Sequence, residues 1–181
     1  MPKYGAFLRG VNLGARRKIS SAELISLFDG LGFDEVGTFR TSGNVVFSSA
    51  REPAARIAGR IGRALADALG EEITVFLRTE RELKAIAEGE PFGAGSGAPS
   101  KGKLQVILLA AKPTAAKRKQ TLALATDEDV LAFGDRELYW LPSGGTQEST
   151  LNLNQIEKGI GPTTMRTMGT IEQLVAKFFD A

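Results

Sequence analysis

The order of the predicted secondary-structure elements constrains the fold more than any other feature of this sequence. Short apolar runs typical of strands alternate with two longer segments in which apolar residues recur at helical spacing. The order is strand, helix, strand, strand, helix, strand, over residues 4–9, 20–31, 36–40, 45–48, 53–69 and 73–78. This βαββαβ order is that of ferredoxin-like folds.

Local signals mark the ends of these elements. Ser20 and Glu23 have the spacing of a capping box at the start of the first helix, and Gly32 follows its end. Ser42-Gly43-Asn44 lies between two apolar runs and predicts a hairpin. Gly70 ends the second helix in the same way as Gly32 ends the first.

The pattern starts again after a segment rich in Gly, Ser and Pro at 91–102, whose composition predicts an exposed connection. A short helix at 80–88 precedes this segment. The elements predicted after it lie at 104–109, 114–125, 130–133, 137–141 and 148–158, with a last helix opened by Thr170 and Gln173 as a capping box. This second series is βαββα and lacks an obvious final strand. It repeats the order of elements without matching residues.

The expected fold is therefore α+β, with two intertwined ferredoxin-like halves that contain antiparallel sheets. The first half covers 1–90, the connection 91–103, and the second half with its C-terminal helix 104–181.

Composition excludes several chemistries. The 181 residues include no cysteine and no histidine, which removes thiolate and histidine nucleophile pairs and nearly all zinc sites. We expect neither a cofactor nor a metal. No apolar run approaches the roughly 20 residues of a membrane helix, and the first residues lack a signal-peptide core. A cytoplasmic protein with no membrane partner is expected; its oligomeric state is left open.

A basic loop is the clearest candidate site. The first twenty residues contain five Lys or Arg and no acidic residue, and three of the cations form the run Arg16-Arg17-Lys18. In a ferredoxin-like half, the loop after the first strand and the hairpin between the second and third strands lie at the same end. The candidate ligand-binding residues are Arg9, Asn12, Lys18, Arg40, Ser42 and Asn44. A phosphate, sulfate or carboxylate near a helix N-terminus would suit them.

Each of these features also has a structural interpretation. Gly10 and Gly14 can shape a turn, and Ser42-Gly43-Asn44 can serve only to close a hairpin. The stripe Arg56, Arg60 and Arg63 is expected to be a solvated helix face. The acidic run Asp127-Glu128-Asp129 is expected to be a solvated turn.

Three motifs resemble those of one bacterial family, catalogued as domain of unknown function sixteen-ninety-seven. They are LRGVNLG at Leu8–Gly14, SGNVVF at Ser42–Phe47 and PFG at Pro91–Gly93, and a T-x-R…T-x-x-x-L ending extends the likeness over nearly the whole chain. The resemblance implies two intertwined ferredoxin-like subdomains, and no established activity, substrate or catalytic residue. Family members often carry Arg-Asn-Trp in the last motif, where this chain has Arg166-Thr167-Met168. A pocket shaped by that tryptophan would be altered here.

Four functions compete. The leading one is binding of a phosphate-bearing or other anionic ligand, such as a nucleotide. The second is single-stranded nucleic-acid binding on a sheet face, with Phe7 and Phe47 as stacking rings. The third is a histidine-free enzyme for an anionic substrate, with Lys18 or Arg9 stabilising charge. The fourth is an interaction module without a ligand. Catalytic residues are not identified.

Overall fold

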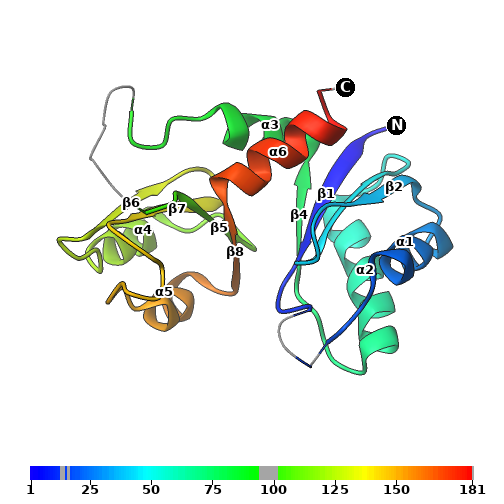
Figure 1. Ribbon diagram of the computed structural model, residues 1–181, viewed down its shortest axis with the longest axis horizontal. Coiled ribbons are helices and arrows are strands. Elements are labelled where there is room, and N and C mark those ends of the chain that lie inside the picture. The colour runs from blue at the N-terminus through cyan, green and yellow to red at the C-terminus, as the bar shows by residue number, and fades with distance from the viewer. Residues whose placement is uncertain (13–14, 16, 94–101, 181) are drawn as a thin grey trace. The chain divides into compact units, whose positions relative to one another are not determined.

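The computed structural model describes residues 1–12, 15, 17–93 and 102–180 (Figure 1). The chain forms two compact units. The first is Met1–Ile86 together with the segment that starts at Leu174, and the second is Ala87–Gln173. Each unit contains one four-stranded antiparallel sheet, so the predicted α+β class with duplicated sheets is confirmed. No helix in the described part of the chain is long and apolar enough to cross a bilayer.

The first unit has the predicted βαββαβ order. Its elements are β1 (Lys3–Leu8), α1 (Ser21–Gly30), β2 (Asp34–Thr38), β3 (Asn44–Ser48), α2 (Ala54–Leu69), β4 (Val75–Thr79) and α3 (Glu80–Glu88). The sheet order is β2-β3-β1-β4, and every neighbouring pair is antiparallel. The loop after β1 and the hairpin between β2 and β3 therefore leave the sheet at the same end.

Helices α1 and α2 cover one face of this sheet (Figure 1). Alternate residues of β1 point to this face and pack against apolar positions of the two helices; they form one cluster with Tyr4, Ala6, Leu8, Leu24, Phe28, Ile57, Ile61 and Leu65. The predicted capping box is present, because Ser20 Oγ accepts a 3.1 Å hydrogen bond from the Glu23 amide. Gly70 ends α2 in the left-handed conformation, with φ of 71°.

Glycines in the strands make room for helices on the other face. A Cβ at Gly5 would lie 2.8 Å from Leu83 Cδ1 of α3, and one at Gly37 would lie 2.9 Å from Phe178 Cε1. Phe178 ends α6 (Met168–Phe178), whose residues from Leu174 onward belong to the first unit. A larger residue at either position would force the neighbouring side chain to shift.

The second unit has the same strand arrangement. Its elements are β5 (Gln105–Leu109), α4 (Ala115–Leu122), β6 (Asp129–Phe133), β7 (Glu137–Pro142), α5 (Leu153–Ile160) and β8 (Thr163–Thr167). The order β6-β7-β5-β8 is that of the first sheet, with corresponding strands in corresponding places. Helix α5 packs on the face that carries Ile107, Leu138 and Trp140.

The second half has the final strand that its sequence does not make obvious, since β8 pairs with β5 along its whole length. The sequence Thr163–Thr167 has only one apolar side chain, Met165, which packs against the helix-covered core. Thr164 and Arg166 are buried on the opposite face. A strand with a single apolar side chain and buried polar residues does not show the apolar-polar alternation by which strands are recognised.

Two predicted helix starts are wrong. Helix α5 begins at Leu153 and not at residue 148, and Asn152 caps it by accepting a 3.0 Å hydrogen bond from the Gln155 amide. Helix α6 begins at Met168, where Thr167 Oγ1 accepts a 3.1 Å hydrogen bond from the Thr170 amide. Thr167, and not the predicted Thr170, therefore caps this helix.

The two halves match in one short stretch of sequence as well as in the order of their elements. This match was not expected from the sequence. The last strand of each sheet ends in an apolar residue, an arginine and a threonine: Leu77-Arg78-Thr79 in β4 and Met165-Arg166-Thr167 in β8. Both arginines are buried, and each Nη1 donates to the carbonyl of the preceding residue, at 3.0 and 2.9 Å. Each threonine hydroxyl then accepts from the amide three residues later, at the start of the next helix.

Most of the segment predicted as an exposed connection, residues 94–101, lies outside the described residues.

Candidate functional site

The basic loop and the β2–β3 hairpin are joined by one side chain. Asn12 Nδ2 donates to the Thr41 carbonyl at 2.7 Å and to the Ile19 carbonyl at 2.9 Å. Its Oδ1 accepts a 2.9 Å hydrogen bond from the Ile19 amide. The amide of Leu8 also donates to the Gly43 carbonyl at 2.8 Å. The juxtaposition that the topology predicts is therefore present.

Close packing explains the glycine of the hairpin. Gly43 has φ of 81°, and a Cβ there would lie 2.4 Å from Val11 Cγ2. The neighbouring Asn44 is buried and donates to the Phe39 carbonyl at 2.8 Å and to Ser42 Oγ at 3.1 Å. These contacts give Ser42-Gly43-Asn44 a structural role in closing the hairpin against the loop.

A cavity of about 370 Å³ opens where the loop, the hairpin and the start of α1 meet. Its polar lining comes from all three segments and comprises Asn12, Lys18, Ser20, Ser21, Glu23, Arg40 and Thr41. Three of the six predicted site residues, Asn12, Lys18 and Arg40, thus line one cavity. Arg9, Ser42 and Asn44 are not among the residues that line it.

The basic run does not act as a unit. Arg17 Nε forms an ion pair with Glu71, so an acidic residue far along the chain offsets one of the cations. Gly10 has φ of 70° and makes room for this pair, because a Cβ there would lie 2.9 Å from Arg17 Nη1. Arg16 lies outside the described residues. Lys18 is the member of the run that lines the cavity.

The charges of the cavity favour an anion but include one carboxylate. Lys18 and Arg40 are both exposed, and the Arg40 guanidinium lies 5.3 Å from the centre of the Phe39 ring. The first turn of α1 adds the partial positive charge of a helix N-terminus. Glu23 also lines the cavity, and one of its carboxylate oxygens accepts a 3.0 Å hydrogen bond from the Ser20 hydroxyl. The second oxygen of a carboxylate is able to accept a ligand hydroxyl.

Strained backbone surrounds this cavity. In the described part of the chain, four residues other than glycine have positive φ, and three of them are Asn12 (56°), Arg17 (53°) and Arg40 (58°). The left-handed conformation is unfavourable for arginine and is better tolerated by asparagine. Strained residues of this kind concentrate at binding and catalytic sites.

The proposed stacking rings are not available in this structure. Phe47 packs in the helix-covered core and stacks on Tyr4, with ring centroids 5.6 Å apart. Phe7 lies on the opposite face of the sheet, because Tyr4, Ala6 and Leu8 take the helix-covered face, and it is fully buried. The two rings therefore offer no common surface for bases.

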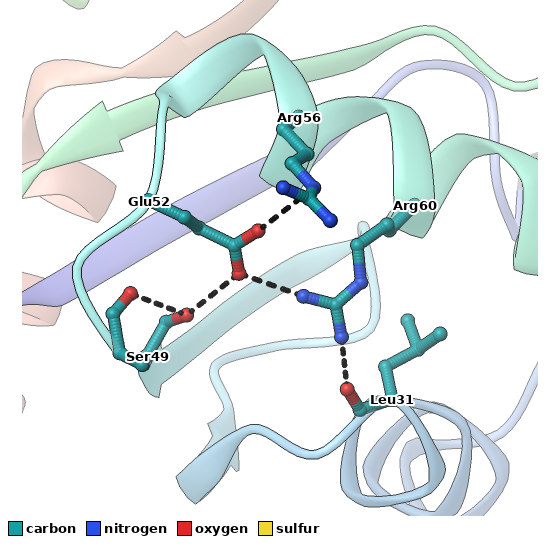
Figure 2. Close-up of polar contacts among 6 residues, drawn as sticks. Leu31, Ser49, Glu52, Arg56 and Arg60 are labelled. Atoms are coloured by element: carbon teal, nitrogen blue, oxygen red, sulfur yellow. Dashed lines mark hydrogen bonds and ion pairs between the residues drawn. The ribbon is translucent and has the colours of Figure 1, made fainter.

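Arg60 is a structural cross-link, so the expectation of a solvated stripe is wrong for this residue (Figure 2). Its Nη1 lies 2.7 Å from Glu52 Oε1, and its Nη2 donates to the Leu31 carbonyl at the end of α1. The guanidinium also lies 4.9 Å from the centre of the Phe33 ring. Arg56, which lies 3.7 Å from the same carboxylate, is exposed.

Asp129 is likewise not part of a solvated turn. Its buried carboxylate accepts hydrogen bonds from Trp140 Nε1 at 2.7 Å, from Ser149 Oγ at 2.8 Å and from the Thr126 hydroxyl. Burial acts to raise the pKa of this carboxyl, but the three hydrogen bonds outweigh it and lower the pKa below its usual value. Among the described residues, no group of three acidic side chains is placed to hold a metal ion.

Sequence reasoning missed the buried arginines. Burial lowers the pKa of Arg166 to about 10, so its guanidinium remains charged at neutral pH. Its Nη1 donates to Thr164 Oγ1 at 3.0 Å as well as to the Met165 carbonyl. The signal that could have revealed Arg78 and Arg166 is the repeated apolar-Arg-Thr sequence followed by a helix.

Comparisons with known proteins show which known fold and which family the chain resembles. No curated protein matches the chain. The solved structure of a conserved bacterial protein, SP0830 from Streptococcus pneumoniae, superposes with a TM-score of 0.72 over 96% of this chain and 98% of that chain. At 18% sequence identity, this similarity shows the fold alone. Residues 1–139 match the family described as protein of unknown function (DUF1697). These residues include the loop and hairpin motifs, and the chain therefore belongs to this family of unknown function.

Proposed function

We propose that this is a small cytoplasmic protein that binds an anionic, phosphate-bearing metabolite in the cavity at the start of α1. The observation that carries the proposal is the meeting of Lys18 and Arg40, from segments far apart in sequence, at one cavity beside a helix N-terminus. Asn12 holds the two segments together through three hydrogen bonds.

The size and lining of the cavity favour a small molecule. A cavity of about 370 Å³ lies near the lower end of the roughly 300–1,000 Å³ that small-molecule sites span. Lys18 and Arg40 supply charge for a phosphate, and Glu23 supplies an acceptor for a hydroxyl group. A nucleotide or sugar phosphate carries both groups, which makes these compounds the first ligands to test.

Binding is better supported than catalysis. The Ser20 hydroxyl, one of the hydroxyls that line the cavity, already caps α1 and donates to Glu23. Glu23 is in turn held at the helix start by that contact, so both groups have structural roles. The arrangement fits recognition of charge and hydroxyl groups by a site that is already formed.

Calorimetric titration of the full chain with phosphate, nucleotides and sugar phosphates tests the proposal. A ligand at 100 times its dissociation constant should also stabilise the protein by about 2.7 kcal/mol. Lys18→Ala and Arg40→Asn should each weaken binding, and asparagine is chosen because it tolerates the left-handed backbone at residue 40. Arg9→Ala tests whether Arg9 contributes to the affinity for the anion although it does not line the cavity.

Arg51→Ala is the matched control, because Arg51 is exposed beyond the far end of β3 from the hairpin. An equal loss of affinity in this control and in Lys18→Ala would contradict the proposed location. Failure of every anion to bind the parent protein would contradict the function itself.

A further inference from the structure

A second cavity lies at the opposite end of the first sheet. It has a volume of about 200 Å³, and its polar lining is Lys3, Glu35, Ser48 and Lys177, with Phe178 among its aromatic residues. Lys3 and Ser48 are directly opposite each other on β1 and β3, at the strand ends remote from the β2–β3 hairpin. This cavity shares no residue with the one at the start of α1.

Glu35, an exposed residue that lines this cavity, has an unfavourable backbone conformation. Its φ is 50°, and the register of β2 against β3 shifts between Asp34 and Gly37, as in a β-bulge. Bulges of this kind re-aim side chains next to functional sites. The Glu35 carboxylate accepts a 2.6 Å hydrogen bond from the buried hydroxyl of Ser48. That hydrogen bond and the attraction of Lys3 lower the pKa of Glu35, so the carboxylate is ionised at neutral pH.

Two lysines supply the opposite charge. The Lys177 ammonium lies 5.1 Å from the centre of the Phe178 ring and 5.9 Å from that of Phe39. Among the interactions of the described residues, neither Lys3 nor Lys177 forms an ion pair within 4 Å. The lining of the cavity thus includes two lysines, one carboxylate and aromatic side chains.

We infer that this cavity binds a small zwitterion of the amino-acid type. The ligand carboxylate lies between Lys3 and Lys177, its ammonium group pairs with Glu35, and its apolar side chain contacts Phe178. A cavity of about 200 Å³ is smaller than the roughly 300–1,000 Å³ of drug-sized sites, which limits the ligand to few heavy atoms. A simple dianion fits less well, because one of its charges would face the Glu35 carboxylate.

The structural role of Glu35 does not explain its conformation. A glutamine or a shorter polar residue also satisfies the Ser48 hydroxyl, and glycine or asparagine adopts positive φ at lower cost. The chain instead keeps a charged side chain in a strained conformation beside two lysines, as expected where strain serves binding. This inference is independent of the anion proposed for the first cavity.

The test is calorimetric titration of the full chain with a panel of the common free amino acids. For the best binder, the α-keto acid that lacks the ammonium group and the amine that lacks the carboxylate are titrated next. The zwitterion should bind, and each analogue should bind roughly tenfold more weakly or worse, because each loses one charge-assisted contact. Absence of binding by every amino acid at millimolar concentration overturns the inference, as does a keto acid that binds as well as its amino acid.

Two variants locate the site. Glu35→Gln keeps an acceptor for Ser48 and removes the charge, so it should lose most of the affinity for the amino acid while keeping the fold. Lys177→Met, at an exposed position of α6, should also lose most of the affinity for the amino acid and keep the fold. It replaces Glu35→Gln as the test if that variant is poorly folded. The matched controls are Asp127→Asn and Lys158→Met, which are exposed in the second unit and should leave affinity unchanged. Unchanged affinity in Lys177→Met overturns the assignment.

Discussion

Asp129 is buried, although it belongs to an acidic run whose other members, Asp127 and Glu128, are exposed. Its carboxylate connects the start of β6 to the Trp140 indole on β7 and to Ser149 in the segment before α5. Burial of a carboxylate is tolerated when hydrogen bonds satisfy its oxygens. The charge of this residue is therefore part of the core of the second unit.

Replacing Asp129 with asparagine should reduce the free energy of unfolding by about 1–3 kcal/mol, because a buried hydrogen-bonded network loses its charged acceptor. The folded-state pKa of Asp129 is lowered, so its contribution is present above the unfolded pKa of about 3.9. It is lost as the pH falls through the lower folded-state value. Urea unfolding at neutral pH and near pH 3 measures both effects. The variant should lose less stability on acidification than the parent, whereas Asp127→Asn should behave like the parent.

At the scale of single residues, the sequence predicted which segments meet better than it predicted which side chains line the cavity beside them. Topology alone brought Asn12 near the β2–β3 hairpin, and the hydrogen bond to Thr41 confirms that placement. The direction of each side chain depends on local backbone angles, which turn Asn44 into the hairpin. The second cavity could not be predicted, because nothing in the sequence around Glu35 signals its positive φ.

At the scale of elements, periodicity predicted the strands and helices whose buried residues are apolar. It failed for β8, where the buried residues Thr164 and Arg166 are polar. Helix ends were predicted where one capping residue was available, as at Ser20, and misplaced where two threonines competed, as at Thr167 and Thr170. The last helix was correctly predicted as amphipathic, and Leu174, Val175 and Phe179 near its end are buried.

Shortening the chain to end at Gln173 should strongly destabilise the first unit. The deletion removes three buried apolar side chains, each worth about 1.5–3 kcal/mol before entropy losses, and uncovers Gly37 where Phe178 packs. Thermal unfolding followed by circular dichroism measures the loss. A chain that ends at Phe179 is the control, since it removes the exposed Asp180, whose contact with Lys84 is 3.7 Å, and keeps the buried residues. Equal melting temperatures for the two shortened chains would show that the end of α6 does not stabilise the protein.

At the scale of the whole molecule, α6 connects the two units within one continuous helix. Its residues up to Gln173 belong to the second unit, and those from Leu174 belong to the first. Unfolding of the first unit removes the packing partners of the second part of this helix. Because helix formation is cooperative, the first part should then lose stability as well.

Gly43→Ala tests this coupling. The substitution places a Cβ 2.4 Å from Val11 in the first unit and imposes φ of 81° on alanine; strain and overpacking together should cost about 2–4 kcal/mol. The single tryptophan, Trp140, is buried in the second unit and reports its unfolding by fluorescence. The denaturation midpoint measured at Trp140 should fall together with that measured by circular dichroism.

Gly32→Ala is the matched control for backbone strain, because its φ is 85° and a Cβ there meets no atom within 4 Å. It should cost only about 1–2 kcal/mol. A Trp140 midpoint that stays at the parent value in Gly43→Ala, while the circular dichroism signal shifts, would mean that the units unfold separately.

The return of the chain to its first unit also sets an order of events during protein synthesis. Residues 1–86 are made before the rest of the two units, but the part of their sheet at Gly37 that receives Phe178 stays uncovered until the residues from Leu174 have been made. Domains often fold during translation, beginning with the N-terminal one. Here the second unit, encoded between the two parts of the first, has been synthesised in full before the returning segment of the first is made. The unit whose synthesis begins first is therefore expected to finish folding last.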